Sequence, residues 1–353
     1  MTVTVDLDRV VADTVHLESL PGAVDRLLQQ CHDVGEPGMT GIRRAGDSIV
    51  LDHLGPLRRL AGLRMFSTLS VVAGDYEENR RTDYAPALTA LLRSRSAGVI
   101  GALATERVCF RIDPLADRWA LRDRISAQLG WRNDPDDWHV NVTRRGHLLL
   151  GQVGALHRSR RFPPMRRLPA STNPVVAALL IHLLQPDSGD LVYDPFCGSG
   201  TLLVEAAAHD QGLALLGSDM SPAALAAAVA NRRLFPMGHL FRADAVRLPM
   251  ATDSVDRVAA NLPFGKRIGS HAANTRLYPF FLRELSRVLR ADGRAVLLTE
   301  EKNLFRRSLD ATHGMRQLRE VKLASGGLHP SAFVLARTRT ARATMASRSG
   351  SRG

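Results

Sequence analysis

The feature that most constrains the fold is a glycine-containing turn between an apolar strand and an apolar helix. Residues 191–193 are typical of a buried strand, and residues 202–208 are typical of the helix that follows it. Between them stands the segment DPFCGSGT, residues 194–201, whose glycines let the backbone turn tightly and approach a ligand. Because ligands of open α/β sheets bind at the carboxyl ends of strands, we expect a cofactor at this turn.

Helices and strands continue to alternate after Asn173. This residue is expected to cap a helix whose first residue is Pro174. Further apolar strands are expected at residues 213–217 and 255–260, with helix-like segments between them. The alternation predicts an α/β fold with a doubly wound, Rossmann-like sheet in residues 174–340.

Acidic residues at the ends of these strands indicate the kind of cofactor. Asp219 follows Gly198 by 21 residues, and its carboxylate can accept hydrogen bonds from ribose hydroxyls. Leu203 stands where a dinucleotide-binding turn has its third glycine, which argues against NAD, and no Gly-Lys-Ser/Thr of a Walker motif follows. Asp194 suits a cationic group better than a pyrophosphate. S-adenosylmethionine carries both an ammonium and a sulfonium, so we predict it as the cofactor.

The candidate cofactor-binding residues stand at three strand ends. Asp244 is interpreted as a partner of the adenine amino group, with a helix cap or a turn residue as the alternative. Cys197 is interpreted as a small neighbour in the turn, because no His or other base stands near it in the sequence to make it a nucleophile. The full set is Asp194, Phe196, Gly198, Gly200, Thr201, Asp219, Met220, Asp244 and Ala245.

The candidate catalytic residues stand in the segment NLPFGKR, residues 261–267, which follows a buried strand. An exocyclic aromatic amine is a poor nucleophile because its lone pair is delocalised into the ring. The side-chain carbonyl of Asn261 and the backbone carbonyl of Leu262 can accept its hydrogens and aim the lone pair at a methyl group. Pro263 stiffens the turn, and Phe264 offers a stacking face for an extruded base. The alternative is an ordinary strand-end turn of the form Asn-x-Pro.

The basic balance of the chain favours a polyanionic partner. The formal net charge is +12 and the sequence pI is near 10.7, and such a surplus attracts nucleic acid through counterion release. The alternative is a basic surface with no specific partner. The segment HRSRRFPPMRR, residues 157–167, is expected to be a linker that either grips phosphates or is a solvated hinge. The candidate RNA-contacting residues are Arg158, Arg160, Arg161, Arg166, Arg167, Lys266 and Arg267.

The remaining sequence carries weaker signals. The first 156 residues have an α+β texture, with helix-like segments at 22–31 and 120–129 and a hairpin turn at residues 144–146. The three widely spaced cysteines match neither a disulfide framework nor a metal site. The sequence has no apolar run long enough for a membrane span and no secretory signal at its N-terminus. We therefore expect a soluble, cytoplasmic protein, and a monomer.

These motifs resemble those of the THUMP-domain RNA methyltransferases, especially the tRNA methylguanosine enzymes and related large-subunit rRNA enzymes. DPFCGSGT resembles the first motif of that family, and NLPFG at residues 261–265 resembles the variant of Asn-Pro-Pro-Tyr found in its guanine-modifying members. The Arg-rich segment and residues 168–170 resemble the strip that joins THUMP to the catalytic domain. Leu262, in place of the motif's second-position proline, favours guanine over adenine.

The resemblance implies five parts along the chain. They are a ferredoxin-like domain at 1–62, a THUMP-like RNA-binding domain at 63–156, a linker at 157–173, a class I methyltransferase domain at 174–340, and a disordered basic tail at 341–353. It also implies methylation of the exocyclic amino group of guanosine in tRNA, with S-adenosylmethionine as methyl donor. The alternatives are rRNA guanine, a glutamine side-chain amide of a protein, and an RNA-binding protein that has this fold but no activity.

Overall fold

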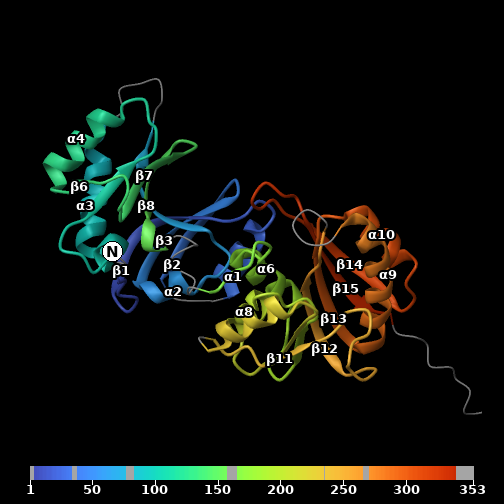
Figure 1. The fold of residues 1–353 in the computed structure, drawn as a ribbon. Helices are drawn as coiled ribbons and strands as arrows, with labels where there is room; N and C mark the ends of the chain where they lie inside the picture. The colour runs from blue at the N-terminus through green and yellow to red at the C-terminus, as the bar shows by residue number, and fades with distance from the viewer. Residues whose placement is uncertain are drawn as a thin grey trace, which may run out of the picture. The chain divides into compact units, whose positions relative to one another are not determined.

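The computed structural model describes residues 4–33, 38–76, 83–156, 165–233, 235–264 and 270–338 (Figure 1). Contacts between α-carbons divide the chain into two compact units. The first unit contains Met1–Met165, Asn173–Leu179 and Leu323–Gly326, and the second contains the rest. The boundary therefore crosses the helix that precedes the glycine-containing turn.

The first unit is built on one eight-stranded mixed sheet with the order β2-β3-β1-β4-β8-β7-β5-β6. Antiparallel pairs dominate it, and β5 runs parallel to β6 and β7. Its elements are β1 (Val10–Glu18), α1 (Val24–Asp33), β2 (Met39–Ala45), β3 (Ser48–Pro56), α2 (Leu57–Gly62), β4 (Thr68–Asp75), α3 (Ala85–Ala97), η1 (Val99–Ala102), β5 (Cys109–Ile112), α4 (Arg118–Leu129), β6 (Arg132–Asn133), β7 (Val140–Arg145), β8 (Leu148–Val153) and η2 (Gly154–Leu156).

The expected local elements of this unit are confirmed. Strands β7 and β8 form an antiparallel hairpin in which Arg145 pairs with Leu148 and Gly146 has a φ of 56°. Helix α4 ends at Gly130, whose φ of 67° is the left-handed conformation that stops a helix. The sheet runs continuously across residue 62, and its division into a ferredoxin-like and a THUMP-like domain stays a prediction.

The second unit is a seven-stranded sheet with the order β11-β10-β9-β12-β13-β15-β14. The five strands from β11 to β13 are parallel, and β15 and β14 add an antiparallel edge. Its elements are the second half of α6 (Pro174–Leu184), β9 (Leu191–Asp194), α7 (Thr201–His209), β10 (Ala214–Asp219), α8 (Pro222–Arg232), β11 (His239–Arg242), β12 (Val255–Asn261), α9 (His271–Val288), β13 (Leu289–Thr299), α10 (Lys302–Asp310), β14 (Met315–Lys322) and β15 (Ser331–Arg337).

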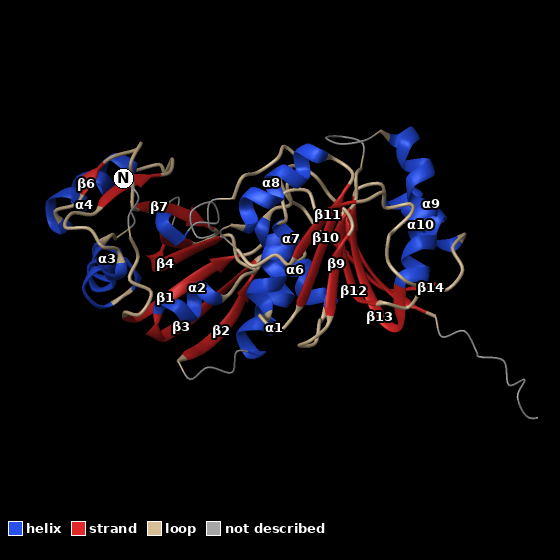
Figure 2. Cartoon of the chain, turned by 60° about the horizontal axis from the view of Figure 1, so that its bottom comes forward, coloured by secondary structure: helices blue, strands red, loops and turns tan. Residues whose placement is uncertain are grey.

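Helices cover both faces of this second sheet, as the doubly wound prediction requires. Figures 1 and 2 show α6 and α8 on one face and α9 and α10 on the other. Fully buried aromatic side chains of Tyr278, Phe281, Phe305 and Phe333 fill the core under α9 and α10. Strand order reverses between β9 and β12, because the chain adds β10 and β11 on one side and β12 and β13 on the other. Such a reversal is where open α/β sheets bind ligands.

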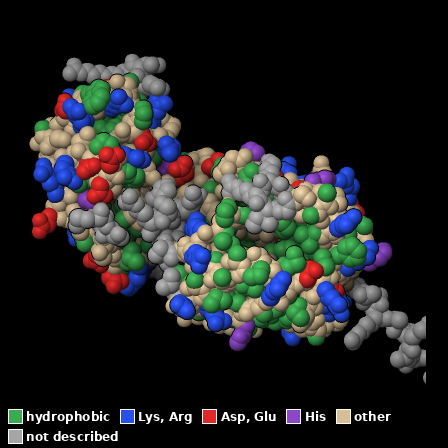
Figure 3. Space-filling view, in the orientation of Figure 1, with side chains coloured by type: hydrophobic (Ala, Val, Ile, Leu, Met, Phe, Trp, Pro, Cys, Tyr) green, Lys and Arg blue, Asp and Glu red, His purple; other side chains and the backbone are tan. Residues whose placement is uncertain are grey.

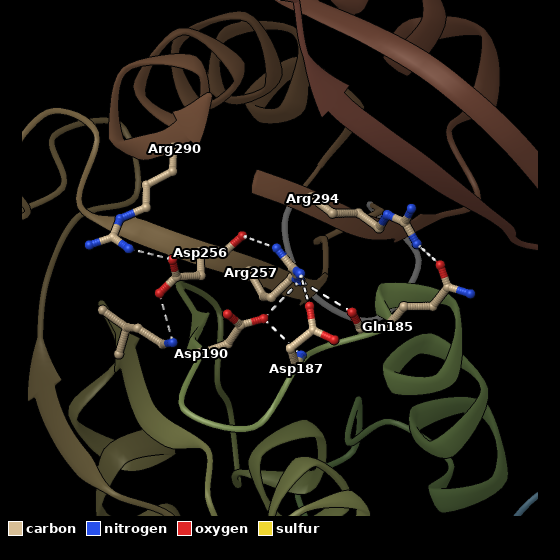
Figure 4. Close-up of polar contacts among 8 residues, drawn as sticks. Gln185, Asp187, Asp190, Asp256, Arg257, Arg290 and Arg294 are labelled. Atoms are coloured by element: carbon tan, nitrogen blue, oxygen red, sulfur yellow. Dashed lines mark hydrogen bonds and ion pairs between the residues drawn. The ribbon is translucent and has the colours of Figure 1, made fainter. Parts of the chain in front are cut away.

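An ion-pair network ties together the amino ends of β9 and β12, opposite the ligand-binding edge (Figure 4). The Arg257 Nη2 lies 3.1 Å from Asp187 Oδ2, and its Nε lies 3.1 Å from Asp190 Oδ2. The Arg257 side chain is 13% exposed, so its charge has little access to water. Arg290, which pairs with Asp256 at 2.8 Å, is 51% exposed. The two pairs therefore differ in burial and should differ in their contribution to stability.

We expect Arg257→Met to lower the free energy of unfolding of the second unit by about 2 to 4 kcal/mol, because the largely buried Arg257 pairs with two carboxylates, of which Asp190 is 18% exposed. Urea denaturation of the full chain, followed by circular dichroism, measures this loss. All three tryptophans (Trp119, Trp131 and Trp138) belong to the first unit, so their fluorescence should show an unchanged transition. Arg290→Met is the matched control, with an expected loss of about 0 to 1 kcal/mol. Equal losses for both variants would contradict the prediction.

Candidate functional site

A cavity of about 450 Å³ lies at the carboxyl ends of the parallel strands in the second unit. Three strands that meet there end in a predicted site residue: β9 in Asp194, β10 in Asp219 and β12 in Asn261. The lining also includes residues of the segment 168–172 and of helix α9. The predicted cofactor and catalytic residues that line it are Asp194, Phe196, Gly198, Thr201, Asp219, Met220, Asp244, Ala245, Asn261, Leu262, Pro263 and Phe264.

The turn after β9 is held by hydrogen bonds from its backbone N–H groups to the neighbouring strand β10. The Gly198 N–H donates to Asp219 Oδ2 at 3.0 Å, and the Cys197 N–H donates to the Ser218 carbonyl at 2.9 Å. Gly200 was predicted to bind cofactor, but it is not among the residues that line the cavity. Its φ is 87°, and a β-carbon there would lie 2.6 Å from the Met237 sulfur. The position therefore requires glycine for its backbone conformation and close packing.

Asp194 places a buried carboxyl group against the cavity. Its side chain accepts the Phe196 N–H at 3.0 Å, and the residue is 2% exposed. Burial raises the pKa of this carboxyl well above its usual range, and the charge of Asp219 raises the pKa further. An ionised carboxylate in such a place needs a cation for compensation. The site therefore favours a positively charged ligand, which agrees with the charge argument from the sequence.

The other two aspartates have local hydrogen bonds as well as a place on the cavity wall. Asp219 Oδ1 accepts the Ser221 N–H at 2.8 Å, so its carboxylate ties the turn to the start of α8. Asp244 Oδ1 accepts the Val246 N–H at 3.1 Å, which is the turn role given as its alternative. Burial, and then the charges of Asp194 and Asp219, raise the pKa of the Cys197 thiol, which agrees with its interpretation as a neighbour and not a nucleophile.

The segment after β12 is held on both sides. The Leu262 N–H donates to the Leu298 carbonyl at 2.9 Å, which extends the pairing of β12 with β13. The Tyr278 hydroxyl donates to the Pro263 carbonyl at 2.7 Å and lies 2.8 Å from Thr299 Oγ1. Phe264 is half-buried on the cavity wall. The backbone of this segment is therefore fixed by the core of the domain before any ligand binds.

Asn261 has a side-chain oxygen that its surroundings do not use. Its Nδ2 donates to Thr172 Oγ1 at 3.0 Å. Its Oδ1 is buried and, among the residues that the structure describes, has no hydrogen-bond partner. An unsatisfied buried acceptor costs free energy of about 1 to 3 kcal/mol. Asn261 Oδ1 can therefore accept a hydrogen bond from a ligand amine without losing an existing one, as predicted from the sequence.

Several residues on the cavity wall were not predicted from the sequence. Ser171 Oγ lies 2.8 Å from Ser199 Oγ, and Asn274 on α9 donates to Glu301 at 2.5 Å. A polar Ser or Asn carries no signal of its own, and the segment 168–172 was interpreted as part of a linker. The additional lining residues are Leu168, Ala170, Ser171, Thr172, Pro195, Cys197, Ser199, Leu202, Ser221, Ala224, Ala243, Ala273, Asn274 and Leu277.

The predicted RNA-contacting residues are only partly described. Arg166 and Arg167 are exposed, and the backbone of Arg166 exchanges hydrogen bonds of 2.7 and 3.0 Å with the Asn231 side chain. Arg158, Arg160, Arg161, Lys266 and Arg267 lie outside the described residues. On the face of the second unit seen in Figure 3, Lys and Arg side chains are widely spread and acidic ones are few. This distribution fits a polyanionic partner.

The described part of the chain contains no group of three or more His, Cys, Asp and Glu side chains placed to hold a metal ion. Cys31, Cys109 and Cys197 are buried free thiols. Among the described helices, none has the length and apolar character that crossing a bilayer demands.

The parallel strands, their reversal of order and the glycine-containing turn define a Rossmann-like domain of the class I methyltransferase type. Residues 164–331 match the RMKL-like methyltransferase domain family. The chain is similar to the tRNA (guanine(6)-N(2))-methyltransferase THUMP3 of Bos taurus, at 33% identity over 261 residues, which cover 67% of this chain and 50% of that protein. It is also similar to the tRNA (guanine(6)-N2)-methyltransferase of Thermus thermophilus, at 38% identity over 208 residues, which cover 56% of this chain and 59% of that protein.

The crystal structure of TrmN from Thermus thermophilus has a similar fold over nearly the whole chain. The TM-score is 0.72 at 26% identity, and the match covers 92% of this chain and 99% of that one. Residues 164–331 therefore carry an RMKL-like methyltransferase domain, and the chain as a whole is similar to the tRNA guanine-N2-methyltransferases named above. It spans about half the length of the mammalian relatives that it matches.

Proposed function

We propose that this protein transfers a methyl group from S-adenosylmethionine to the exocyclic amino group of a guanosine in tRNA. The observation that carries the proposal is the unused Oδ1 of Asn261, a residue that lines the same cavity as the buried Asp194. The Asn261 oxygen can accept a hydrogen bond from an amine, and the Asp194 carboxylate suits a cationic methyl donor. The relatives named as tRNA guanine-N2-methyltransferases support guanosine in tRNA over the other acceptors.

The residues at the three strand ends fit S-adenosylmethionine. Asp194 would face its positive charge, and Asp219 would accept from its ribose while holding the Gly198 N–H. Asp244 and Ala245 line the part of the cavity where the adenine would lie. Phe196 and Met220 add apolar surface to the cavity. When bound, the cofactor supplies an electrophilic methyl group. No metal ligand is needed in this scheme.

The protein's own contribution to the reaction is the positioning of the amine. Asn261 Oδ1 and the Leu262 carbonyl would accept hydrogen bonds from its two N–H groups, so that the nitrogen becomes pyramidal and its lone pair is no longer conjugated with the ring. Phe264 would stack on the base, while Tyr278 holds the Pro263 carbonyl and so keeps this segment rigid. These roles need no covalent intermediate with the enzyme.

We also propose the finer organisation on the N-terminal side. Residues 1–62 would be a ferredoxin-like domain, residues 63–156 a THUMP-like module that binds the tRNA, and the segment 157–173 a phosphate-contacting linker before the catalytic domain. The protein would act as a cytoplasmic monomer. The basic side chains Arg166 and Arg167 beside the cavity wall at Leu168 support the linker role.

Methyl transfer to separate RNA fractions tests the proposed function. Labelled S-adenosylmethionine is supplied with bulk tRNA or with ribosomal RNA, and the product nucleosides are then identified. Methylguanosine in the tRNA fraction is the expected result. Label in rRNA alone would mean that the acceptor is rRNA and not tRNA, while the proposed methyl-transfer chemistry would stand. Cofactor binding by calorimetry without transfer to either RNA would contradict the activity and favour a protein acceptor or a non-catalytic RNA-binding protein.

A further inference from the structure

Thr172 contacts the Asn261 side chain although the two residues are far apart in the sequence. Its Oγ1 accepts a hydrogen bond from Asn261 Nδ2 at 3.0 Å, across 89 positions of the chain. Both residues are partly buried, and both line the cavity. The contact therefore joins the segment before α6 to the strand end that carries the proposed chemistry.

A side-chain amide must be held in one orientation to serve as an acceptor. Its NH₂ and C=O ends have nearly the same shape, so rotation by 180° exchanges them at little steric cost. If Asn261 presented its NH₂ to a substrate amine, two sets of N–H donors would face each other. In the structure the Thr172 hydroxyl accepts from Nδ2, and this arrangement leaves Oδ1 for the ligand. Within the part of the chain that the structure describes, Oδ1 has no hydrogen-bond partner.

The segment that carries Thr172 is itself held in place. Ser171 Oγ accepts the Leu168 N–H at 2.7 Å and lies 2.8 Å from Ser199 Oγ in the glycine-containing turn. At its other end, the Asn231 side chain bonds both the N–H and the carbonyl of Arg166. A hydroxyl on a fixed backbone can orient its neighbour, because it does not need to be ordered when the substrate binds.

We propose that Thr172 is a positioning residue that holds the Asn261 amide in place for methyl transfer, with Nδ2 engaged and Oδ1 left for the ligand. The inference rests on the proposed function and extends it to a residue outside the strand-end motifs. It also gives the segment 166–172 a part in the reaction as one wall of the site. Thr172 acts through Asn261 and contacts neither the base nor the methyl donor in this scheme.

Thr172→Val, which keeps the shape and removes the hydroxyl, is expected to lower kcat about tenfold, the scale of one lost hydrogen bond. The dissociation constants for S-adenosylmethionine and tRNA should stay within about twofold of wild type, since the amide would be misoriented only for the chemical step. Thr172→Ser should restore most of kcat. Thr275→Val is the matched control: its hydroxyl donates to the Ala272 carbonyl on the exposed side of α9, and wild-type kcat is expected.

Single-turnover rates in an Asn261→Ala background separate positioning from general loosening of the site. Thr172→Val should have no further effect there, because the residue that it orients is absent. An unchanged kcat in Thr172→Val, a Ser variant as slow as the Val variant, or the same tenfold loss in the Asn261→Ala background would each overturn the inference while leaving the proposed function intact. A wild-type protein that methylates no RNA would overturn the proposed function, and the inference with it.

Discussion

Asn261→Ala is expected to lower kcat for tRNA methylation about a thousandfold, the range found when a positioned group that acts on the reacting atoms is removed. The variant loses the Oδ1 acceptor, so the amine lone pair stays delocalised in the ring. The S-adenosylmethionine dissociation constant should change less than about twofold, because the carboxylates of Asp194 and Asp219 are untouched. Single-turnover methyl transfer gives the rate, and calorimetry gives the affinity.

Two further substitutions make the Asn261 result specific. Asn261→Gln keeps the amide but moves it by one methylene, and it should remain at least a hundredfold slow if position matters as much as chemistry. Asn303→Ala, on the exposed side of α10, removes an amide that bonds Arg306 and should leave kcat unchanged. If Asn261→Ala turns over at the wild-type rate, the proposed acceptor role is wrong.

The sequence predicted the parts of the site whose geometry is local. A strand, a turn with two glycines and a helix follow one another at β9 and α7, so their relation is set within about twenty residues. Asp194, Asp219 and Asn261 each end a buried parallel strand, and such ends meet at one edge of a sheet. Their place on one cavity therefore followed from the alternation of helices and strands.

The residues that were missed depend on contacts between distant segments. Thr172 is 89 positions from Asn261, and Asn274 reaches the cavity because α9 packs against the sheet, which no local pattern reveals. The Pro- and Arg-rich composition before α6 predicted a linker, yet residues 168–172 are part of the wall. Gly200 shows the converse. The sequence correctly indicated that this position of the turn needs a glycine, but the reason is close packing against Met237 and not contact with a cofactor. In the first unit, the order of eight strands likewise depends on pairings that the alternation alone does not specify.

Asp194→Asn is expected to weaken S-adenosylmethionine binding roughly 100-fold while making the ligand-free protein more stable at pH 8, since a buried charge without a partner is removed. The pKa of Asp194 is raised by burial and by Asp219, so in the wild type its carboxyl ionises at a higher pH in the folded than in the unfolded state. Stability is then lost as pH rises from the usual carboxyl range through the raised pKa. The Asn variant lacks this loss, and its melting temperature should exceed that of wild type by a few degrees at pH 8.

The pH dependence of the two effects distinguishes a ligand-binding carboxylate from a structural one. The stability gain of Asp194→Asn should shrink as pH falls from the raised pKa and should disappear below the usual carboxyl range, where the wild-type carboxyl is protonated in both the folded and the unfolded state. Wild-type affinity for S-adenosylmethionine should rise with pH through the same range, because the ionised form binds the cation, and the variant should lack that rise. Asp292→Asn, an exposed change of the same charge on β13, should affect neither quantity. A variant that binds normally but melts earlier would instead mean that Asp194 serves mainly to hold the Phe196 N–H, and it would remove the electrostatic argument for a cationic cofactor.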